Sequence, residues 1–404
     1  MRAYERLIQY TAFPSASNPE NAACPSTPEQ LAFGRALVDE MRALGIQDAR
    51  IDAHGYVYGT IEANIENWNG TTIGFIAHMD VTVDAPSLDI RPRIVENYDG
   101  GDIILSENIV LSPNEYETLK DYTGKSLVVT DGKTLLGADD KAGVAEIMTM
   151  VEELNNNPAI KHGRICIAFT PDEEIGRGAD LFDVAGFGAD YAYTVDGAAF
   201  GEVEYESFNA TAGTVTVTGK GIHPGEAKDK MLNAQLVAME FESLMPEKQK
   251  PQYTAGYEGF IHLVNMRGTV EETVMHYILR DHDAEKLKEK EGLFLAAAQT
   301  LNKKYGENTV QAKVKESYRN MAEIIKEHWH LIETAQQAIL TLGGKPVCKP
   351  IRGGTDGSRL SFMGLPCPNL GNGSHNHHGR KEYAVIEDMD KCVQLLIEIA
   401  KLYA

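Results

Sequence analysis

Five short motifs of acids and histidines follow one another along the chain, and these residue types are the ones that bind divalent metal ions. In order they are His78-Met79-Asp80, Gly137-Ala138-Asp139-Asp140-Lys141, Asp172-Glu173-Glu174, Val195-Asp196-Gly197 and His377-His378-Gly379. Several of them come directly after a short apolar run, where the chain would leave a buried strand. Carboxylates gathered there are costly unless positive charge neutralises them, and a pair of divalent cations does this most simply. The motifs together predict a two-metal site with hydrolytic chemistry.

The first motif pairs a histidine with an acid two residues later. His78 and Asp80 follow the apolar run 73–77, and in an extended chain residues two apart point the same way. A metal-binding histidine needs its second ring N–H held by an acceptor, and Asp80 is placed to provide one. Taken alone, this motif also fits a solvated loop.

Two further motifs carry adjacent acids. Glu173 and Glu174 follow the apolar run 165–169. Two adjacent carboxylates can have different roles, because one can bind metal while the other accepts a proton from the metal-bound water. Asp139 and Asp140 stand at an expected helix start, where two acids repel unless one caps the helix and the other meets a cation. We assign Asp139 to the metals and Asp140 to capping or support of the site.

The elements that would position these motifs alternate between strands and helices. Thr27 as N-cap and Pro28 as first residue predict a helix that stops at Gly45. Further apolar patterns predict strands near 49–62, 72–77, 164–169 and 191–195, a helix over 140–154 and a final amphipathic helix containing Val393 to Leu402. This alternation predicts an α/β fold with a doubly wound, mostly parallel sheet.

The pattern changes between residues 208 and 317. The predicted order is strand 211–218, helix 232–245, strands 260–267 and 270–280, helix 283–304 and strand 309–317. This βαββαβ order is that of the split ferredoxin-like unit. Because the last histidine motif lies beyond it, we expect a catalytic domain of residues 1–207 and 318–404 with an inserted ferredoxin-like α+β domain, residues 208–317.

Length and composition agree with this organisation and exclude some partners. The chain has 404 residues, more than one core usually organises, and 43% of them are apolar. With 59 acids against 38 bases, the net charge of −21 opposes binding to nucleic acid or to an anionic membrane. No stretch approaches the roughly 18 apolar residues of a membrane span, and the start of the chain has no signal-peptide pattern, so we expect a cytoplasmic protein. Five scattered cysteines without a CxxC pair indicate neither a disulfide framework nor a zinc–thiolate site.

The set of motifs resembles that of the co-catalytic dizinc metallopeptidases, a superfamily that includes aminoacylases, carboxypeptidases and dipeptidases. Longer stretches are similar to its tripeptide aminopeptidases. They are TDGKTLLGADDKAG (130–143), AFTPDEE (168–174), YTVDG (193–197), EGF (258–260), MHY (275–277) and PIRGGTDG (350–357). The likeness runs over almost the whole chain.

This resemblance implies two Zn²⁺ ions per chain, although Co²⁺ or Mn²⁺ can occupy such ligands. His78 and Asp196 would hold one ion, Glu174 and His378 would hold the other, and Asp139 would bridge them. Each ion then has three protein ligands and room for a shared water, as a catalytic site requires.

The resemblance also implies that Glu173 is the general base, with Asp80 supporting the first ligand histidine. In one respect the chain departs from the family, which usually has an aromatic residue before the last ligand, where this chain has His377. His378 is assigned because it directly precedes Gly379; His377 is the competing choice and His375 a weaker one.

Substrate contacts are expected in the inserted domain and in a glycine-rich loop. In relatives a histidine at the position of His223 stabilises the tetrahedral oxyanion, often in the partner subunit. Arg352 and Arg280 are candidates for binding a peptide carboxylate. The resemblance implies tripeptide substrates and a homodimer formed through the inserted domain, which would act as lid and dimerisation domain. Another hydrolase of the superfamily (dipeptidase, carboxypeptidase or aminoacylase) is the nearest alternative, and a non-catalytic metal-binding scaffold is a more distant one.

Overall fold

The computed structural model describes the whole chain, residues 1–404. It divides into two compact units. Unit 1 comprises Met1–Tyr205, Met321–Lys349 and Thr355–Ala404, and unit 2 comprises Glu206–Asn320 and Pro350–Gly354. None of the helices is both long enough and apolar enough to cross a membrane.

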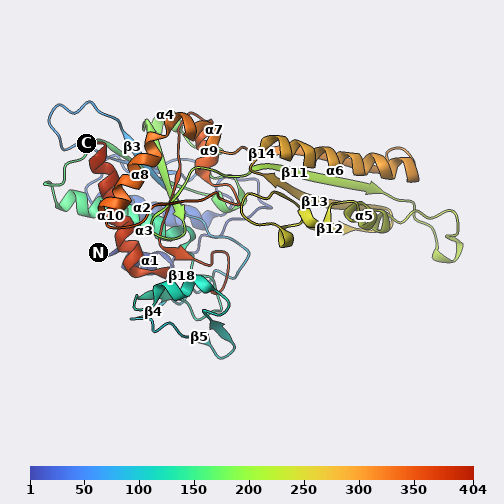
Figure 1. The fold of residues 1–404 in the computed structure, drawn as a ribbon, viewed down its shortest axis with the longest axis horizontal. Helices are drawn as coiled ribbons and strands as arrows, with labels where there is room; N and C mark the ends of the chain where they lie inside the picture. Colours follow the sequence, from blue (N-terminus) through green and yellow to red (C-terminus); the bar gives the residue numbers. More distant parts are fainter. The chain divides into compact units, whose positions relative to one another are not determined.

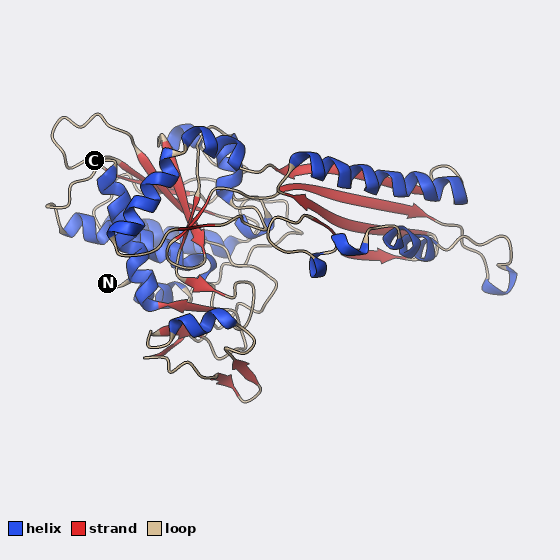
Figure 2. Ribbon diagram, viewed as in Figure 1, coloured by secondary structure: helices blue, strands red, loops and turns tan.

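Unit 1 is organised around an eight-stranded sheet with strand order β1-β2-β8-β3-β9-β16-β10-β15. Its strands are β1 (Arg50–Ile51), β2 (Val57–Ile61), β3 (Ile73–His78), β8 (Ile165–Thr170), β9 (Tyr191–Gly197), β10 (Glu202–Glu204), β15 (Val347–Cys348) and β16 (Asn369–Gly371). β3 lies between β8 and β9 and pairs parallel with both, and β16 runs parallel to β9. Every residue of β3 and β8 is buried, because helices lie on both sides of this sheet (Figure 2). The predicted doubly wound, mostly parallel α/β sheet is confirmed.

Three helices of unit 1, over residues 28–43, 138–156 and 386–402, lie where helices were predicted, and no bounds were predicted for the others. The helices of this unit are α1 (Ala3–Tyr10), α2 (Pro28–Ala43), α3 (Ala138–Asn156), α4 (Val184–Phe187), α7 (Ala322–Ile325), α8 (His330–Thr341), α9 (Asp356–Phe362) and α10 (Ile386–Leu402). α2 begins at Pro28 as predicted but ends before Gly45, and the Thr27 hydroxyl donates to the carbonyl of Ala16 at 2.8 Å instead of capping the helix. α3 packs against both β3 and α10.

A second, four-stranded sheet in unit 1 was not predicted from the sequence. Its order is β17-β18-β7-β4. β5 and β6, which lie between β4 and β7 in the sequence, form a separate two-stranded hairpin. The bounds are β4 (Arg93–Val95), β5 (Ile103–Ser106), β6 (Ile109–Leu111), β7 (Leu127–Val129), β17 (Ser374–His375) and β18 (Tyr383–Val385). Because β18 pairs with β7, the segment that follows His378 lies beside the segment that leads to Asp139.

Unit 2 has the predicted βαββαβ order. In chain order its elements are β11 (Asn209–Thr218), α5 (Ala234–Ser243), β12 (Phe260–Gly268), β13 (Glu272–Asp281), α6 (Ala284–Tyr305) and β14 (Val310–Tyr318). The strands form an antiparallel sheet of order β12-β13-β11-β14. Figure 1 shows α6 running along this sheet, and apolar residues of α5 and α6 join those of the strands in one core.

Candidate metal centre

Three of the predicted motifs meet at the carboxyl ends of neighbouring strands. His78 is the last residue of β3, Asp196 lies near the end of β9, and Glu173 and Glu174 follow β8 in a short 3₁₀ turn, η2 (Glu173–Ile175). Since β8, β3 and β9 are adjacent and parallel, these ends lie at one edge of the sheet, where open α/β sheets place their sites.

Asp139 and Asp140 join this edge from the start of α3. The Nε2 atom of His78 lies 2.9 Å from Oδ1 of Asp139 and 3.5 Å from Oδ1 of Asp196. Two overlapping groups have ligand atoms within 4.8 Å of one another: His78 with Asp139 and Glu174, and His78 with Asp140 and Asp196. One histidine and four acids from four separate motifs therefore form a single cluster.

The two acids at the start of α3 have different surroundings. The carboxylate of Asp140 is fully buried and accepts three hydrogen bonds, from the backbone N–H groups of His78 (3.2 Å) and Gly143 (3.2 Å) and from the amide of Asn372 (2.9 Å). The oxygens of Asp139 instead face imidazole rings. Asp140 is thus held by the protein framework, whereas Asp139 keeps its oxygens toward the cluster.

His378 approaches the same cluster from the segment between β17 and β18. Its Nε2 lies 3.0 Å from Oε2 of Glu174 and 3.4 Å from Oδ2 of Asp139, and its Nδ1 lies 3.1 Å from Oδ2 of Asp84. The Nδ1 of His377 is 3.6 Å from Oδ2 of Asp139, and its Nε2 is taken up by the hydroxyl of Ser374 at 2.7 Å. Of the two rings, His378 has the closer contacts with the acids.

His375, the weaker alternative, has a different environment. Its ring is buried between Tyr122 and Tyr383, and its Nε2 lies 2.7 Å from the Tyr122 hydroxyl. Burial lowers the pKa of His375 to about 3. The ring therefore belongs to the core beneath the second sheet of unit 1.

The carboxylate of Asp80 mainly positions two other acids. Its oxygens accept the backbone N–H groups of Glu173 and Glu174 at 3.0 and 3.1 Å. It lies 3.5 Å from Nδ1 of His78, whereas the main-chain carbonyl of Asp80 lies nearer to that nitrogen, at 3.0 Å. Asp80 thus connects the turn after β3 to the turn after β8, a role that spacing alone did not suggest.

Ser26, Gln30 and Asn369 support the centre and were not predicted from the sequence. Asp172 accepts hydrogen bonds from the backbone of Ser26 (2.8 Å) and the amide of Gln30 (2.8 Å), which fixes the turn just before the two glutamates. Asn369 accepts the backbone N–H of Asp196 at 3.1 Å. These partners are distant in sequence and follow no motif, so the sequence carries no signal for them.

The electrostatics of the cluster reflect buried, closely spaced charge. Burial raises the pKa of Glu173 and of Asp196. Burial, followed by repulsion from Asp139, raises the pKa of Glu174 to about 7. Hydrogen bonds to Asp139 and Glu174 raise the pKa of His378 to about 11.

The donor set fits a pair of divalent ions. Imidazole nitrogens and carboxylate oxygens are ordinary zinc ligands, and the cluster places ligand atoms of both types within 4.8 Å of one another. The Oε1 atom of Glu174 is buried and has no hydrogen-bond partner. A buried acceptor without a donor is costly, and a metal ion would satisfy it.

The three predicted substrate contacts lie in unit 2. His223 is exposed and its Nδ1 accepts the backbone N–H of Gly225 at 3.1 Å. The Arg352 guanidinium donates to the carbonyls of Gly256 (2.6 Å) and Glu258 (2.8 Å). Arg280 donates to the carbonyl of Arg352 at 3.3 Å, and its buried Nε has no partner. The two arginines thus lie side by side, and Arg280 has the less satisfied guanidinium.

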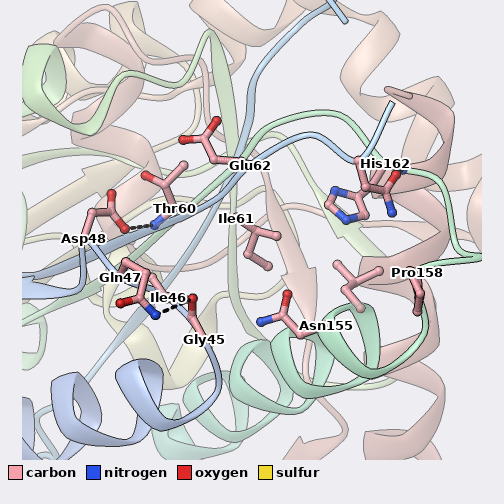
Figure 3. A pocket seen from close by; sticks show the side chains of 12 residues that line it. Gly45, Ile46, Gln47, Asp48, Thr60, Ile61, Glu62, Asn155, Pro158 and His162 are labelled. Atoms are coloured by element: carbon pink, nitrogen blue, oxygen red, sulfur yellow. Dashed lines mark hydrogen bonds between the residues drawn. The ribbon is translucent and has the colours of Figure 1, made fainter. Parts of the chain in front are cut away.

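A separate hollow of about 420 Å³ in unit 1 contains none of the predicted site residues. Figure 3 shows that its lining comes from the turn after α2, from β2, from the end of α3 and from the segment that follows α3. Its polar groups are already bonded locally: Asp48 accepts the N–H of Thr60 at 2.9 Å, and the Asn155 amide donates to the carbonyl of Leu44 at 2.5 Å. These polar groups thus stabilise the turns that surround the hollow.

The fold and the centre together define a class: a metallohydrolase built on a mostly parallel α/β sheet, with clustered histidine and carboxylate side chains that could hold metal ions and an inserted α+β unit. The chain belongs to Peptidase family M20/M25/M40, whose sequence pattern matches residues 116–402.

Several proteins called Peptidase T are similar over the full length. The one from Caldanaerobacter subterraneus subsp. tengcongensis is 49% identical over 404 residues, covering 100% of this chain and 98% of the relative. The one from Desulfitobacterium hafniense is 52% identical over 402 residues, covering 99% and 98%. Among solved structures, aminopeptidase PepT from Bacillus cereus has the same fold, with a TM-score of 0.75 and 22% identity over 99% of this chain and 97% of that one.

Proposed function

We propose that this peptidase is a dizinc aminopeptidase that removes the N-terminal residue from tripeptides. The observation that carries the proposal is the identity of 49% and 52%, over nearly the whole of both chains, with proteins called Peptidase T. At this level of full-length similarity the substrate class is expected to be shared. The clustered ligands supply the chemistry that such a reaction needs.

In this proposal His78 and Asp196 would hold one ion, Glu174 and His378 would hold the second, and Asp139 would contribute to both. The short contacts of Asp139 Oδ1 with His78 (2.9 Å) and of Glu174 Oε2 with His378 (3.0 Å) support this pairing. When bound, the metal pair polarises the scissile carbonyl and lowers the pKa of water toward about 7. Zinc is proposed as the resident metal, and Co²⁺ or Mn²⁺ would suit the same ligands.

Glu173 is proposed as the general base. It stands beside Glu174, and Asp80 accepts the backbone N–H of both residues, so the main chain that carries the two glutamates is held in place. The raised pKa that burial gives Glu173 suits a group that must take a proton from water and release it to the leaving amine. A general base contributes typically about 10²–10⁴-fold to the rate.

Substrate recognition is proposed to involve unit 2. Arg280 and Arg352 are proposed to bind the peptide carboxylate, and Arg280 is favoured because its buried Nε has no partner. His223 is proposed to stabilise the oxyanion. The homodimer formed through this unit and the cytoplasmic location stay predictions.

Rates on peptides of different length and end group test the proposal. We expect tripeptides with a free amino terminus to be hydrolysed fastest, with release of the first residue, and dipeptides, tetrapeptides and N-acetylated tripeptides to be poor substrates. A preference for the acetylated peptide would favour an aminoacylase or carboxypeptidase and refute the aminopeptidase assignment. Metal bound without hydrolysis of any of these peptides would indicate the scaffold alternative.

A further inference from the structure

Glu382 is a buried acid, distant from Asp139 in the sequence, whose carboxylate accepts hydrogen bonds from backbone N–H groups. It is 2% exposed and lies just before β18. Its Oε2 accepts the N–H groups of Leu136 and Gly137, each at 2.7 Å, and its Oε1 accepts the N–H of Asp139 at 3.0 Å. One side chain therefore binds three donors of a single turn, the turn that delivers Asp139 to the centre.

The conformation of that turn explains why it needs such a partner. Gly137 has φ +75°, in the left-handed region that favours glycine, so the chain reverses just before α3 begins. The reversal turns successive N–H groups toward one point, which forms a backbone nest for an anion. Left without an acceptor, these buried donors would destabilise the turn.

Glu382 is itself anchored next to the last histidine motif. Its backbone N–H donates to the carbonyl of Gly379 at 3.3 Å, which closes the turn that follows His378. The next residues form β18, which pairs with β7, the strand that leads toward Asp139. The carboxylate thus joins the two segments that carry Asp139 and His378, proposed ligands that are far apart in the sequence.

We propose that Glu382 is a positioning residue that fixes the relative placement of Asp139 and His378. Its carboxylate accepts hydrogen bonds from three backbone N–H groups, so its effect reaches the centre through the two side chains that these turns carry. The inference rests on the proposed function in so far as Asp139 and His378 bind metal. Substitution of residues that orient metal ligands typically costs about 10–100-fold in metal affinity, and we expect a loss in this range.

Glu382→Gln is the test variant because it keeps the size but replaces one acceptor oxygen with an amide donor. Glu146→Gln is the matched control, since Glu146 is also buried in unit 1, on α3, and its carboxylate oxygens bond nothing. Zinc affinity is measured by chelator competition, and the kcat and KM for a tripeptide are measured as zinc is increased. Amide exchange of the segment 135–141 is followed by mass spectrometry on the metal-free proteins.

For E382Q we expect zinc affinity about 10–100-fold weaker than in the wild type, faster exchange in segment 135–141 only, and recovery of kcat at saturating zinc with KM unchanged. E146Q should match the wild type in all three readouts. Zinc affinity within about twofold of the wild type, or unchanged exchange in this segment, would overturn the inference, as would a loss of activity that excess zinc does not restore.

If E382Q does not fold, Glu382→Asp takes its place, because it keeps the charge but withdraws the oxygens by one methylene; the same results are expected from it. Failure of the proposed function is distinguishable from failure of this inference. A wild type that binds no zinc pair would refute the former, whereas the amide exchange of the metal-free proteins still tests the latter.

Discussion

Replacing Asp80 with asparagine tests how the two glutamates of the centre are held. The carboxylate of Asp80 accepts the backbone N–H of Glu173 through one oxygen and that of Glu174 through the other, at 3.0 and 3.1 Å. Asparagine retains a single oxygen. One of the two N–H groups would therefore face an amide donor, and the turn after β8 would shift away from its present position.

The size of this effect follows from the hydrogen bond that is lost and the buried N–H that is left without an acceptor. A hydrogen bond to a charged group contributes about 1.5–3 kcal/mol, and a buried N–H left without an acceptor costs about 1–3 kcal/mol. Because these two terms overlap, we expect about 2–4 kcal/mol for the loss of the arrangement. At about 1.4 kcal/mol per tenfold, this corresponds to a fall of about 30- to 700-fold in kcat/KM for a tripeptide.

The assay compares Asp80→Asn with Asp190→Asn at equal zinc occupancy. Asp190 also accepts a backbone N–H, that of Thr72 at 2.8 Å, but it lies just before β9, at the opposite end of the strand from Asp196. The control should keep kcat/KM within about threefold of the wild type, as is usual for surface substitutions. If D80N also stayed within that range with both metals bound, the positioning role of Asp80 would be refuted.

Three further predictions concern the centre itself. Glu173→Gln should retain both metals while kcat falls about 10²–10⁴-fold, and full activity with tripeptide would show that Glu173 is not the base. His378→Ala should weaken zinc binding more than His377→Ala, because the His378 ring has the closer contacts with Glu174 and Asp139; equilibrium dialysis measures this, and the reverse order would move the ligand role to His377. Zinc binding should release protons, since the pKa of His378 is raised to about 11 and that of Glu174 to about 7 and both must bind metal deprotonated. Zinc affinity should then rise with pH, and the part of this rise that comes from Glu174 should level off above about pH 7. Calorimetry in buffers of different ionisation enthalpy measures the protons released, and finding none would contradict this prediction.

The sequence predicted the elements that follow strong local patterns. The start of α2 at Pro28, the buried strands β3 and β8 and the order of unit 2 all come from periodicity and capping, which act over a few residues. The second sheet of unit 1 was missed because its strands have only two or three residues each and pair across distant parts of the chain. Strands of two or three residues are too short to show the alternation of apolar and polar residues that predicts a strand.

In the site, residue type predicted which side chains gather but not how each one is held. The spacing of His78 and Asp80 indicated that the two side chains point the same way. The Asp80 carboxylate instead accepts the N–H groups of the turn after β8, and the main-chain carbonyl of Asp80 is the atom nearest to Nδ1 of His78. Glu382 follows no motif because its partners are backbone amides, which are the same in every sequence. Contacts of this kind depend on tertiary structure, so only the fold reveals them.

A zinc titration of the metal-free protein, read out as release of the N-terminal residue from a tripeptide, tests the two-metal centre most directly. We expect activity to be absent without metal and to reach its full value at two equivalents of zinc per chain. Full activity at one equivalent, or metal-free protein that hydrolyses the tripeptide at the same rate, would contradict a two-metal centre built on Asp139.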